Sequence, residues 1–268
     1  MGRPPNPLLS RDRIVSTALA LADSVGLDAV STRRLAAELG VTGPSLYNHV
    51  GTKEELLDDM VDTVLARVDT SMFTQLSKTN PAWRTALEQW ARNYRDAIAT
   101  HPNIVPALAI GLGRRPNVLQ AANSVFGGLV STGWPRREAI GVGAVIRYFV
   151  LGSALGSFAS AFRAGAAVYS NNYPHLDGAH LLAARQQRVD QRAFDAGLQA
   201  VLDGLELRYQ LLATASSPLP SSVCRRVANR VHPQGRNTDR ARSGTARTPS
   251  SGRELFPGLS NRLASDCQ

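Results

Sequence analysis

Hydrophobic residues recur at intervals of three and four along most of this chain, which is the spacing of amphipathic helices. The pattern is clearest over residues 10–25, 31–40, 52–65, 83–100 and 189–213. Alternation of polar and apolar residues with a period of two, which is typical of half-buried strands, is found nowhere. The sequence therefore predicts an all-α fold.

Capping and stop signals divide the N-terminal part of the chain into short helices. Ser10 and Ser31 are suitable N-caps, because a serine oxygen can accept a hydrogen bond from a backbone N–H in the first turn. Gly26, followed by Leu27, supplies a left-handed stop for the first helix, and the second helix ends at Gly40-Val41. A third helix follows after about three residues and has Pro44 in its first turn, where a missing N–H costs nothing.

The next helix begins with a capping box. Thr52 can accept a hydrogen bond from the Glu55 amide while the Glu55 side chain reaches back to the helix start. The polar segment 77–81 that follows indicates a domain boundary. Beyond it, shorter helices are predicted at 104–110 and 118–131.

Two long helices are predicted at 136–162 and 189–213, with a loop over 164–178 between them. Small residues lie along one side of the first long helix. A glycine inside a helix costs up to about 1 kcal/mol relative to alanine, so several together indicate close packing against another helix.

The two short helices at 31–50, joined by a tight turn at Gly40 and preceded by an amphipathic helix, predict a helix-turn-helix. In such a motif the second short helix enters the major groove of DNA. The inner positions are apolar. Polar side chains are expected on the outer face at Thr42, Ser45, Asn48 and His49.

Charge and cysteine content change this picture little. Of the net charge of +9, the tail from residue 214 supplies +6, with nine arginines against three acidic residues. A solvated, disordered tail is the simplest interpretation. A second hypothesis gives the tail sequence-independent affinity for phosphates. The two cysteines, Cys224 and Cys267, lie in this tail and form no metal-ligand spacing or disulfide framework. With neither a signal peptide nor a membrane span expected, the sequence predicts a cytoplasmic protein.

Residues 30–61, VSTRRLAAELGVTGPSLYNHVGTKEELLDDMV, resemble the DNA-binding domain of the TetR family of repressors. The order of residues from Thr32-Arg33 to Leu56-Leu57 carries the resemblance. It continues more weakly into the next domain, which is similar to the tetracycline-repressor subclass at Trp83, Tyr94-Arg95, His101, Gly111 and Arg115-Pro116.

The resemblance implies that Arg33, Gly43, Pro44 and Ser45 approach base edges and that Tyr47, His49 and Lys53 hold phosphates. Arginine can grip guanine O6 and N7 in a bidentate way, whereas phosphate contacts fix register. Gly43 replaces a larger polar residue of the tetracycline repressors, which removes a base contact. The full set expected at the DNA is Thr32, Arg33, Thr42, Gly43, Pro44, Ser45, Tyr47, Asn48, His49 and Lys53.

Each of these residues also has a simpler interpretation. Tyr47 can belong partly to the core, and His49 can be a solvated residue at a helix end. Arg33 can pair with Glu38 or another acid, and Lys53 can be the exposed first residue of its helix.

In tetracycline repressors the drug arrives as a magnesium chelate. The resemblance places the matching positions of this chain at Asp69, Trp90, Tyr94 and Leu108, and a leucine side chain cannot ligate a metal. We therefore expect an effector other than tetracycline, with no metal and no cofactor. Candidate residues for an apolar ligand pocket between helices are Trp90, Tyr94, Leu108, Ile110 and Phe126, although aromatic residues at helical spacing also form plain core.

By resemblance, the two long helices form a four-helix bundle with a second subunit, with Gly152, Gly156, Leu198, Leu202 and Leu205 at the homodimer interface. The predicted organisation is an N-terminal arm at 1–9, a three-helix DNA-binding domain at 10–70, a helical effector-binding and dimerisation domain at 78–213, and the tail at 214–268.

The functional prediction is a one-component repressor that binds a palindromic double-stranded operator as a dimer and is released by a small-molecule effector. An alternative is a helical protein whose second domain mainly binds a protein partner. An enzyme is not expected, because no set of nucleophile, base and orienting acid is recognisable.

Overall fold

The computed structural model describes residues 9–110 and 115–215. Within these residues every regular element is a helix, which confirms the predicted fold class. Contacts divide the chain into two compact units, residues 1–210 and 211–268. All the packing described below lies in the first unit. Most of the N-terminal arm and nearly all of the tail fall outside the described residues.

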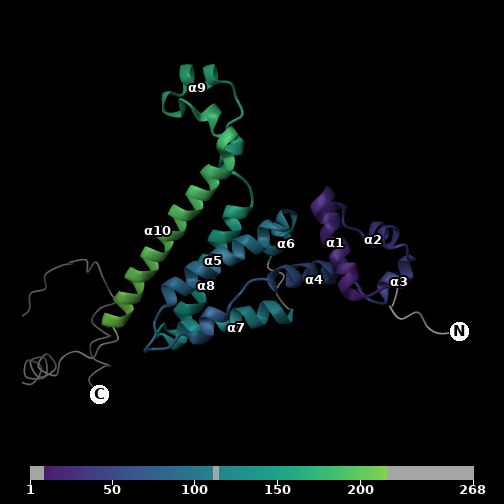
Figure 1. Ribbon diagram of the computed structural model, residues 1–268, viewed down its shortest axis with the longest axis horizontal. Coiled ribbons are helices and arrows are strands. Elements are labelled where there is room, and N and C mark those ends of the chain that lie inside the picture. Colours follow the sequence, from purple (N-terminus) through teal and green to yellow (C-terminus); the bar gives the residue numbers. More distant parts are fainter. Residues whose placement is uncertain (1–8, 111–114, 216–268) are drawn as a thin grey trace, which may run out of the picture. The chain divides into compact units, whose positions relative to one another are not determined.

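Four helices form the N-terminal part (Figure 1): α1 Arg11–Val25, α2 Thr32–Leu39, α3 Gly43–Tyr47 and α4 Lys53–Leu65, with a 3-10 turn η1 at Leu27–Ala29. The predicted caps are confirmed. Ser10 accepts a hydrogen bond from the Arg13 amide at 3.2 Å, and Ser31 accepts one from the Arg34 amide at 3.3 Å. Because serine caps satisfy otherwise unpaired N–H groups, they fix where α1 and α2 begin.

The turn between α2 and α3 depends on Gly40. Its φ of 68° and ψ of 33° lie in the left-handed region, and the predicted end of the second helix at this residue is confirmed. The next amide, that of Val41, donates to the Ala36 carbonyl at 3.0 Å and closes the turn. Gly26 also has positive φ, 92°, but its ψ of 157° is extended, so the predicted left-handed helical stop is only half right there.

The start of α4 differs in detail from the predicted capping box. Thr52 does accept from the Glu55 amide at 3.1 Å. The Glu55 carboxylate, however, accepts from the Gly51 amide at 2.9 Å, one residue before the expected partner. The glutamate therefore stabilises the connection between α3 and α4 as well as the first turn of α4.

The remaining helices of the described chain are α5 Trp83–Ala99, α6 Val105–Ala109, α7 Pro116–Ser131, α8 Arg136–Ala154, α9 Ala166–Asn172 and α10 Gln186–Ala215. Short 3-10 helices lie in several of the connections, at η2 Ser71–Gln75, η3 Pro102–Ile104, η4 Phe158–Ala161, η5 Pro174–Leu176, η6 Ala179–Leu181 and η7 Ala183–Arg185. Helix α8 packs against α5 and α7, and α4 contacts both α1 and α7.

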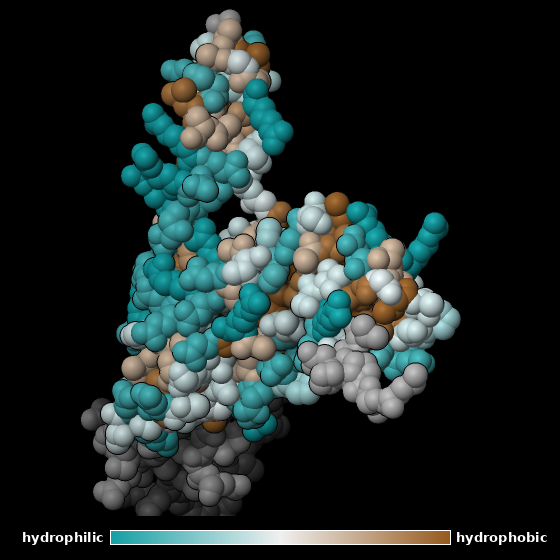
Figure 2. All heavy atoms as spheres, turned by 45° about the vertical axis from the view of Figure 1, so that its right-hand side comes forward, coloured by the Kyte–Doolittle hydropathy of each residue, from teal (hydrophilic) through white to brown (hydrophobic). Residues whose placement is uncertain are grey.

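Two predictions in the C-terminal half were wrong. The helix predicted over 136–162 ends at Ala154, and after Gly156 the Ser157 side chain caps the separate turn η4. The predicted loop at 164–178 contains α9, where the buried Tyr169 accepts a hydrogen bond from the Ala164 amide at 3.1 Å. Figure 2 shows hydrophobic residues at the surface around α9, in agreement with the exposed side chains of Val168, Leu176 and Leu181.

An aromatic cluster lies where the start of α5, the connection between α7 and α8, and the last turns of α10 meet. The rings of Trp83, Trp134 and Tyr209 lie 5.1–5.3 Å apart, and the Tyr209 hydroxyl donates to the Thr132 carbonyl at 2.6 Å. Aromatic pairs of this kind contribute about 0.5–1.5 kcal/mol each beyond their burial. They attach α10 to α5 and to the connection between α7 and α8.

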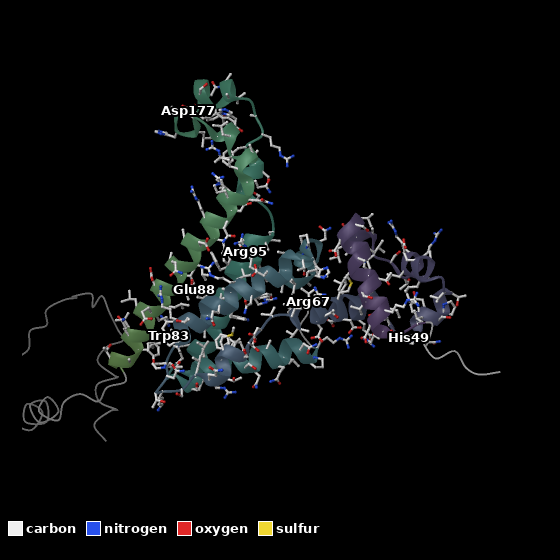
Figure 3. All side chains as sticks on the ribbon, viewed as in Figure 1. His49, Arg67, Trp83, Glu88, Arg95 and Asp177 are labelled. Atoms are coloured by element: carbon white, nitrogen blue, oxygen red, sulfur yellow. The ribbon has the colours of Figure 1, made fainter. Side chains whose placement is uncertain are left out.

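Polar pairs attach the middle of α10 to α5. Arg84 bonds to Asp203 at 2.6 Å, and Arg92 bonds to Asp195 at 2.6 Å. The Arg95 guanidinium lies 4.1 Å from the centre of the Phe194 ring. Figure 3 labels Trp83, Glu88 and Arg95 along α5.

The segment Arg136–Ala161, which includes α8, is long and apolar enough by composition to cross a membrane, a property the sequence analysis did not identify. A core helix of a soluble protein passes the same test. Only 33% of the most apolar window is buried inside the chain, although one face of α8 packs on α5 and α7. The other face of α8 is therefore unusually apolar for a surface.

Candidate nucleic-acid interface and ligand cavity

The helix-turn-helix presents its predicted residues at the surface. None of the ten is buried, whereas Leu46 and Val50 of the same segment are almost completely enclosed. Two contacts between hydroxyl groups link residues of the outer face. The Thr32 and Tyr47 hydroxyls lie 3.4 Å apart, and those of Thr42 and Ser45 lie 2.9 Å apart. The apolar inner side holds α3 against α2, and the polar outer side is left for another molecule.

Tyr47 and His49 differ in exposure. Tyr47 is 55% exposed, so the interpretation as a core residue fails. His49 is half-buried, and its carbonyl accepts a hydrogen bond from Arg11 at 3.1 Å. Figure 3 labels His49, which follows α3.

Two cations of this surface have no acidic partner. Among the described residues, no ion pair involves Arg33 or Lys53, and both side chains are exposed. The alternative pairing of Arg33 with Glu38 is therefore wrong. An unpaired guanidinium and an unpaired ammonium on one polar surface suit a polyanion such as DNA.

Helix α4 lies between this surface and the rest of the chain, and Asp59 is its central contact. The Asp59 carboxylate, 12% exposed, pairs with Arg11 of α1 at 2.6 Å and with Arg115 before α7 at 3.0 Å. The hydrogen bond with Asp59 raises the pKa of the Arg11 guanidinium. Since Arg11 also bonds to the His49 carbonyl, a short chain of polar contacts joins Arg115 to the end of the recognition helix.

One turn further along α4, Asp62 accepts two hydrogen bonds from the start of α7. The donors are the Asn117 side chain at 2.9 Å and the Val118 amide at 3.1 Å. A carboxylate is favourable here, because the first N–H groups of a helix lack partners and carry partial positive charge. Arg115 adds a bond to the Glu55 carbonyl at 3.2 Å. The first turn of α7 is thus fixed to α4.

A second connection reaches the end of α1. His101 lies 2.7 Å from the Asp23 carboxylate, and Asn103 donates to the Ala22 carbonyl at 2.9 Å. Arg67, just beyond α4, lies 3.4 Å from the other ring nitrogen of His101. The segment after α5 therefore holds the far end of α1.

A cavity of about 220 Å³ lies among the end of α4, α5, α7 and α8. Three of the five residues predicted for a ligand pocket line it: Trp90, Tyr94 and Phe126. Leu108 is buried without lining it, and Ile110 is 75% exposed. The reason is that α6 ends at Ala109, which leaves Ile110 beyond the helix and outside the packed core.

Helix α8 contributes residues that the sequence analysis missed, chiefly Gly143 and Arg147. A Cβ atom at Gly143 would lie 2.5 Å from the Phe126 ring, so this glycine makes room for a cavity wall. Arg147 donates to the Leu108 carbonyl at 2.6 Å. Arg147 is the one charged residue of α8 beyond its first turn, and this was the available signal. Burial raises the pKa of the Tyr94 phenol, and the nearby Arg147 opposes this shift.

The residues predicted for a dimer interface fall into two groups. Leu198, Leu202 and Leu205 are buried within the chain itself, so they are core residues of α10. Gly152 and Gly156 are exposed. The structure thus does not bring these five residues to one surface.

Two family models match the chain. The model described as bacterial regulatory proteins, tetR family, matches residues 14–60, which span α1 to most of α4. The model described as tetracyclin repressor-like, C-terminal domain, matches residues 77–209. Together they cover the helix-turn-helix, most of the residues that line the cavity, and most of α10.

Individual proteins agree with these matches. The HTH-type transcriptional repressor DrrR1 of Streptomyces coeruleorubidus is 31% identical over 239 residues, which are 81% of this chain and 84% of that protein. An HTH-type transcriptional regulator of Saccharopolyspora erythraea is 31% identical over 147 residues, 55% of this chain and 60% of the relative. The crystal structure of Streptomyces coelicolor ActR in complex with actinorhodin has a TM-score of 0.59 and 30% identity, over 79% of this chain and 100% of that one.

Proposed function

Because this chain belongs to the TetR family of DNA-binding transcriptional regulators, we propose that it is a one-component repressor whose dimer leaves a palindromic operator when a small effector other than tetracycline binds. The observation that carries the proposal is the set of contacts joining the exposed helix-turn-helix to the cavity through α4. The protein acts on double-stranded DNA in the cytoplasm and needs no cofactor.

The outer face of α2 and α3 supplies the DNA contacts. Arg33 reads guanine in a bidentate way, and Pro44 meets a thymine methyl. Tyr47, His49 and Lys53 hold phosphates and set the register of α3 in the major groove. The remaining residues of the interface are Thr32, Thr42, Gly43, Ser45 and Asn48.

A second copy of the chain covers the apolar outer face of α8 and α10. Gly141, Val145 and Gly152 of α8 are exposed, as are Ala200 and Gly204 of α10. A Cβ atom at any of these three glycines would meet nothing within 4 Å, so their smallness serves no packing inside the chain. Small residues allow helices of two subunits to approach closely. The two recognition helices then read half-sites about 34–36 Å apart.

Helix α4 couples the cavity to the DNA. Val118 lines the cavity and its amide is bonded to Asp62, while Arg115 bonds to Asp59 and through it reaches Arg11 and His49. An effector that shifts the start of α7 therefore moves α4 and the recognition helix with it. For a near-complete switch the effector must favour the released state by about 5.5 kcal/mol.

The cavity suits an effector other than a metal chelate of tetracycline. Among the described residues that line it, none carries a carboxylate or an imidazole, the groups that ligate hard or borderline cations. The neighbour ActR was solved in complex with actinorhodin, which supports the proposal that this chain also binds a small molecule.

The test is selection of bound sequences from a random DNA pool by the full chain. We compare the wild type with Tyr47→Ala and, as a matched control, with Tyr173→Ala, since Tyr173 is 54% exposed but lies after α9. The expected result is a near-palindromic site that the wild type and Tyr173→Ala select and Tyr47→Ala loses. Equal, unspecific and salt-sensitive binding by all three proteins would refute the proposal.

A thermal-shift screen separates effector binding from the alternative of a protein partner. A small molecule that binds only the folded state raises the melting temperature. Compounds that stabilise the protein should also release the selected operator. Release that requires a protein partner instead would favour the alternative.

A further inference from the structure

Arg147 is the one charged residue among the described residues that line the cavity. It lies within α8 and is only partly exposed. Moving a guanidinium from water into an apolar wall is costly unless an anion or several acceptors compensate it. The position of Arg147 therefore requires an explanation.

The contacts of Arg147 compensate its charge only partly. One terminal nitrogen donates to the Leu108 carbonyl at 2.6 Å, and the group lies close to the Tyr94 hydroxyl. Among the described residues no carboxylate lies within ion-pair distance. An arginine carries five N–H donors in a fixed fork, so donors remain for an anion in the cavity.

The rest of the cavity is apolar and in part aromatic. Trp90 and Tyr94 are stacked with their ring centres 6.0 Å apart, and Phe126 adds a third ring. An apolar cavity of about 150 Å³ binds benzene. The present cavity, at about 220 Å³, accepts a larger flat molecule.

We propose that the effector is an aromatic carboxylic acid, bound as its anion, with its rings in the apolar part of the cavity and its carboxylate on Arg147. This inference rests on the proposed function and specifies the ligand class of the same site. A carboxylate fits better than a single oxyanion, because its two oxygens match the guanidinium fork.

Tyr94 is a second donor to the same carboxylate. Burial raises the pKa of its phenol, so the hydroxyl keeps its proton at neutral pH and can donate a hydrogen bond. The hydroxyl and the guanidinium together form one polar corner in the apolar cavity. Such a corner orients a flat ligand that apolar contacts alone would leave free to turn.

A purely structural role of Arg147 makes a different prediction. In that case the arginine only holds the end of α6 through the Leu108 carbonyl, and an uncharged ligand of the same shape binds as well as an acid. The comparison of an acid with its primary amide therefore separates the two roles, because the amide keeps the shape and loses the charge.

The experiment measures the affinity of the full chain for three matched pairs by calorimetry at neutral pH. The pairs are benzoate and benzamide, 2-naphthoate and 2-naphthamide, and anthracene-2-carboxylate and its amide. At least one acid should bind about 10- to 100-fold more tightly than its amide, the value expected for hydrogen bonds to a charged group. Arg147→Met should remove this preference, and Arg147→Lys should keep part of it.

Arg95→Met is the matched control, since Arg95 lies on α5, is also partly exposed and does not line the cavity. It should keep the preference for the acid. Melting by circular dichroism verifies that each variant folds, and Arg147→Gln replaces Arg147→Met should the latter unfold. The comparison of acid and amide on the wild type needs no variant.

Three results would overturn the inference: no acid of the series binds, an amide binds as tightly as its acid, or Arg147→Met keeps the preference. Selection of an operator by the ligand-free wild type is measured separately. Failure of that selection refutes the proposed function, whereas a selected operator together with any of the three results refutes the ligand class alone.

Discussion

The helix-turn-helix and the cavity are built in different ways. All the residues proposed to contact DNA lie between Thr32 and Lys53, and caps and turns within the same stretch fix their positions. The residues that line the cavity run from Leu65 to Tyr148 and come from four helices. The helix-turn-helix is thus a local structure whose surface is fixed by neighbouring residues. The cavity forms only when helices distant in the sequence have packed together.

This difference predicts that each region can be damaged without the other. The N-terminal helices keep their own small core around Leu46, which is fully enclosed. The cavity wall depends on the close approach of Phe126 to Gly143. The contacts of Asp59 and Asp62 join the two regions, and in the proposed function they couple one to the other.

The largest effect is expected for Leu46→Ala. Removing an enclosed leucine costs about 2–5 kcal/mol of unfolding free energy, so α3 should lose its fixed position and operator binding should fail. Urea unfolding and operator binding are the measurements.

Gly143→Ala tests the cavity in the same way that Leu46→Ala tests the helix-turn-helix, since the added Cβ displaces the Phe126 ring. It should change ligand affinity and spare operator binding in the absence of ligand. Loss of operator binding in both variants would contradict the separation.

A smaller effect is expected for Asp59→Ala, which leaves Arg11 and Arg115 without their shared carboxylate. Because Arg11 is well exposed, the loss of unfolding free energy should be about 1–3 kcal/mol. Ligand binding should remain, but its effect on operator affinity should weaken. The measurement is operator affinity with and without ligand for the wild type, Asp59→Ala and Arg115→Ala. Full release by ligand in Asp59→Ala would remove this residue from the coupling.

The smallest effect is expected for Gly43→Gln. A Cβ atom at Gly43 meets nothing within 4 Å, and its φ is not positive, so a longer side chain fits at the start of α3. The variant should gain a preference at one position of each half-site, worth about 1–3 kcal/mol. Parallel sequence selections with the wild type and the variant measure it. An unchanged site would show that position 43 does not face a base.

The difference between the local helix-turn-helix and the cavity formed by distant helices also explains which features could be predicted from the sequence. The caps at Ser10, Ser31 and Thr52 and the turn at Gly40 follow from neighbouring residues, and the structure confirms them. Trp90, Tyr94 and Phe126 do line the cavity, because the inner face of a long helix is set by its periodicity.

The wrong predictions concern residues whose position depends on packing against a helix that is distant in the sequence. Ile110 is exposed because α6 is short, and Arg147 was missed because only the folded chain shows that it lines a cavity. Leu198 and Leu202 lie in a helix of the proposed interface but pack inward, and helical periodicity alone does not say which of two apolar faces would meet a second subunit. In the proposed dimer, the exposed glycines mark the face that meets the second subunit.

The double anchoring of α4 has a consequence for the construction of hybrid sensors. A designer who transplants α1 to α4 onto the ligand-binding part of a relative carries Asp59 and Asp62 into the hybrid but leaves Arg115 and Asn117 behind. The junction can be placed anywhere after α4. If α4 couples the cavity to the DNA as proposed, the acceptor also needs an arginine and a hydrogen-bond donor at the start of its corresponding helix. Compatibility of donor and acceptor can therefore be judged from two positions before any gene is assembled.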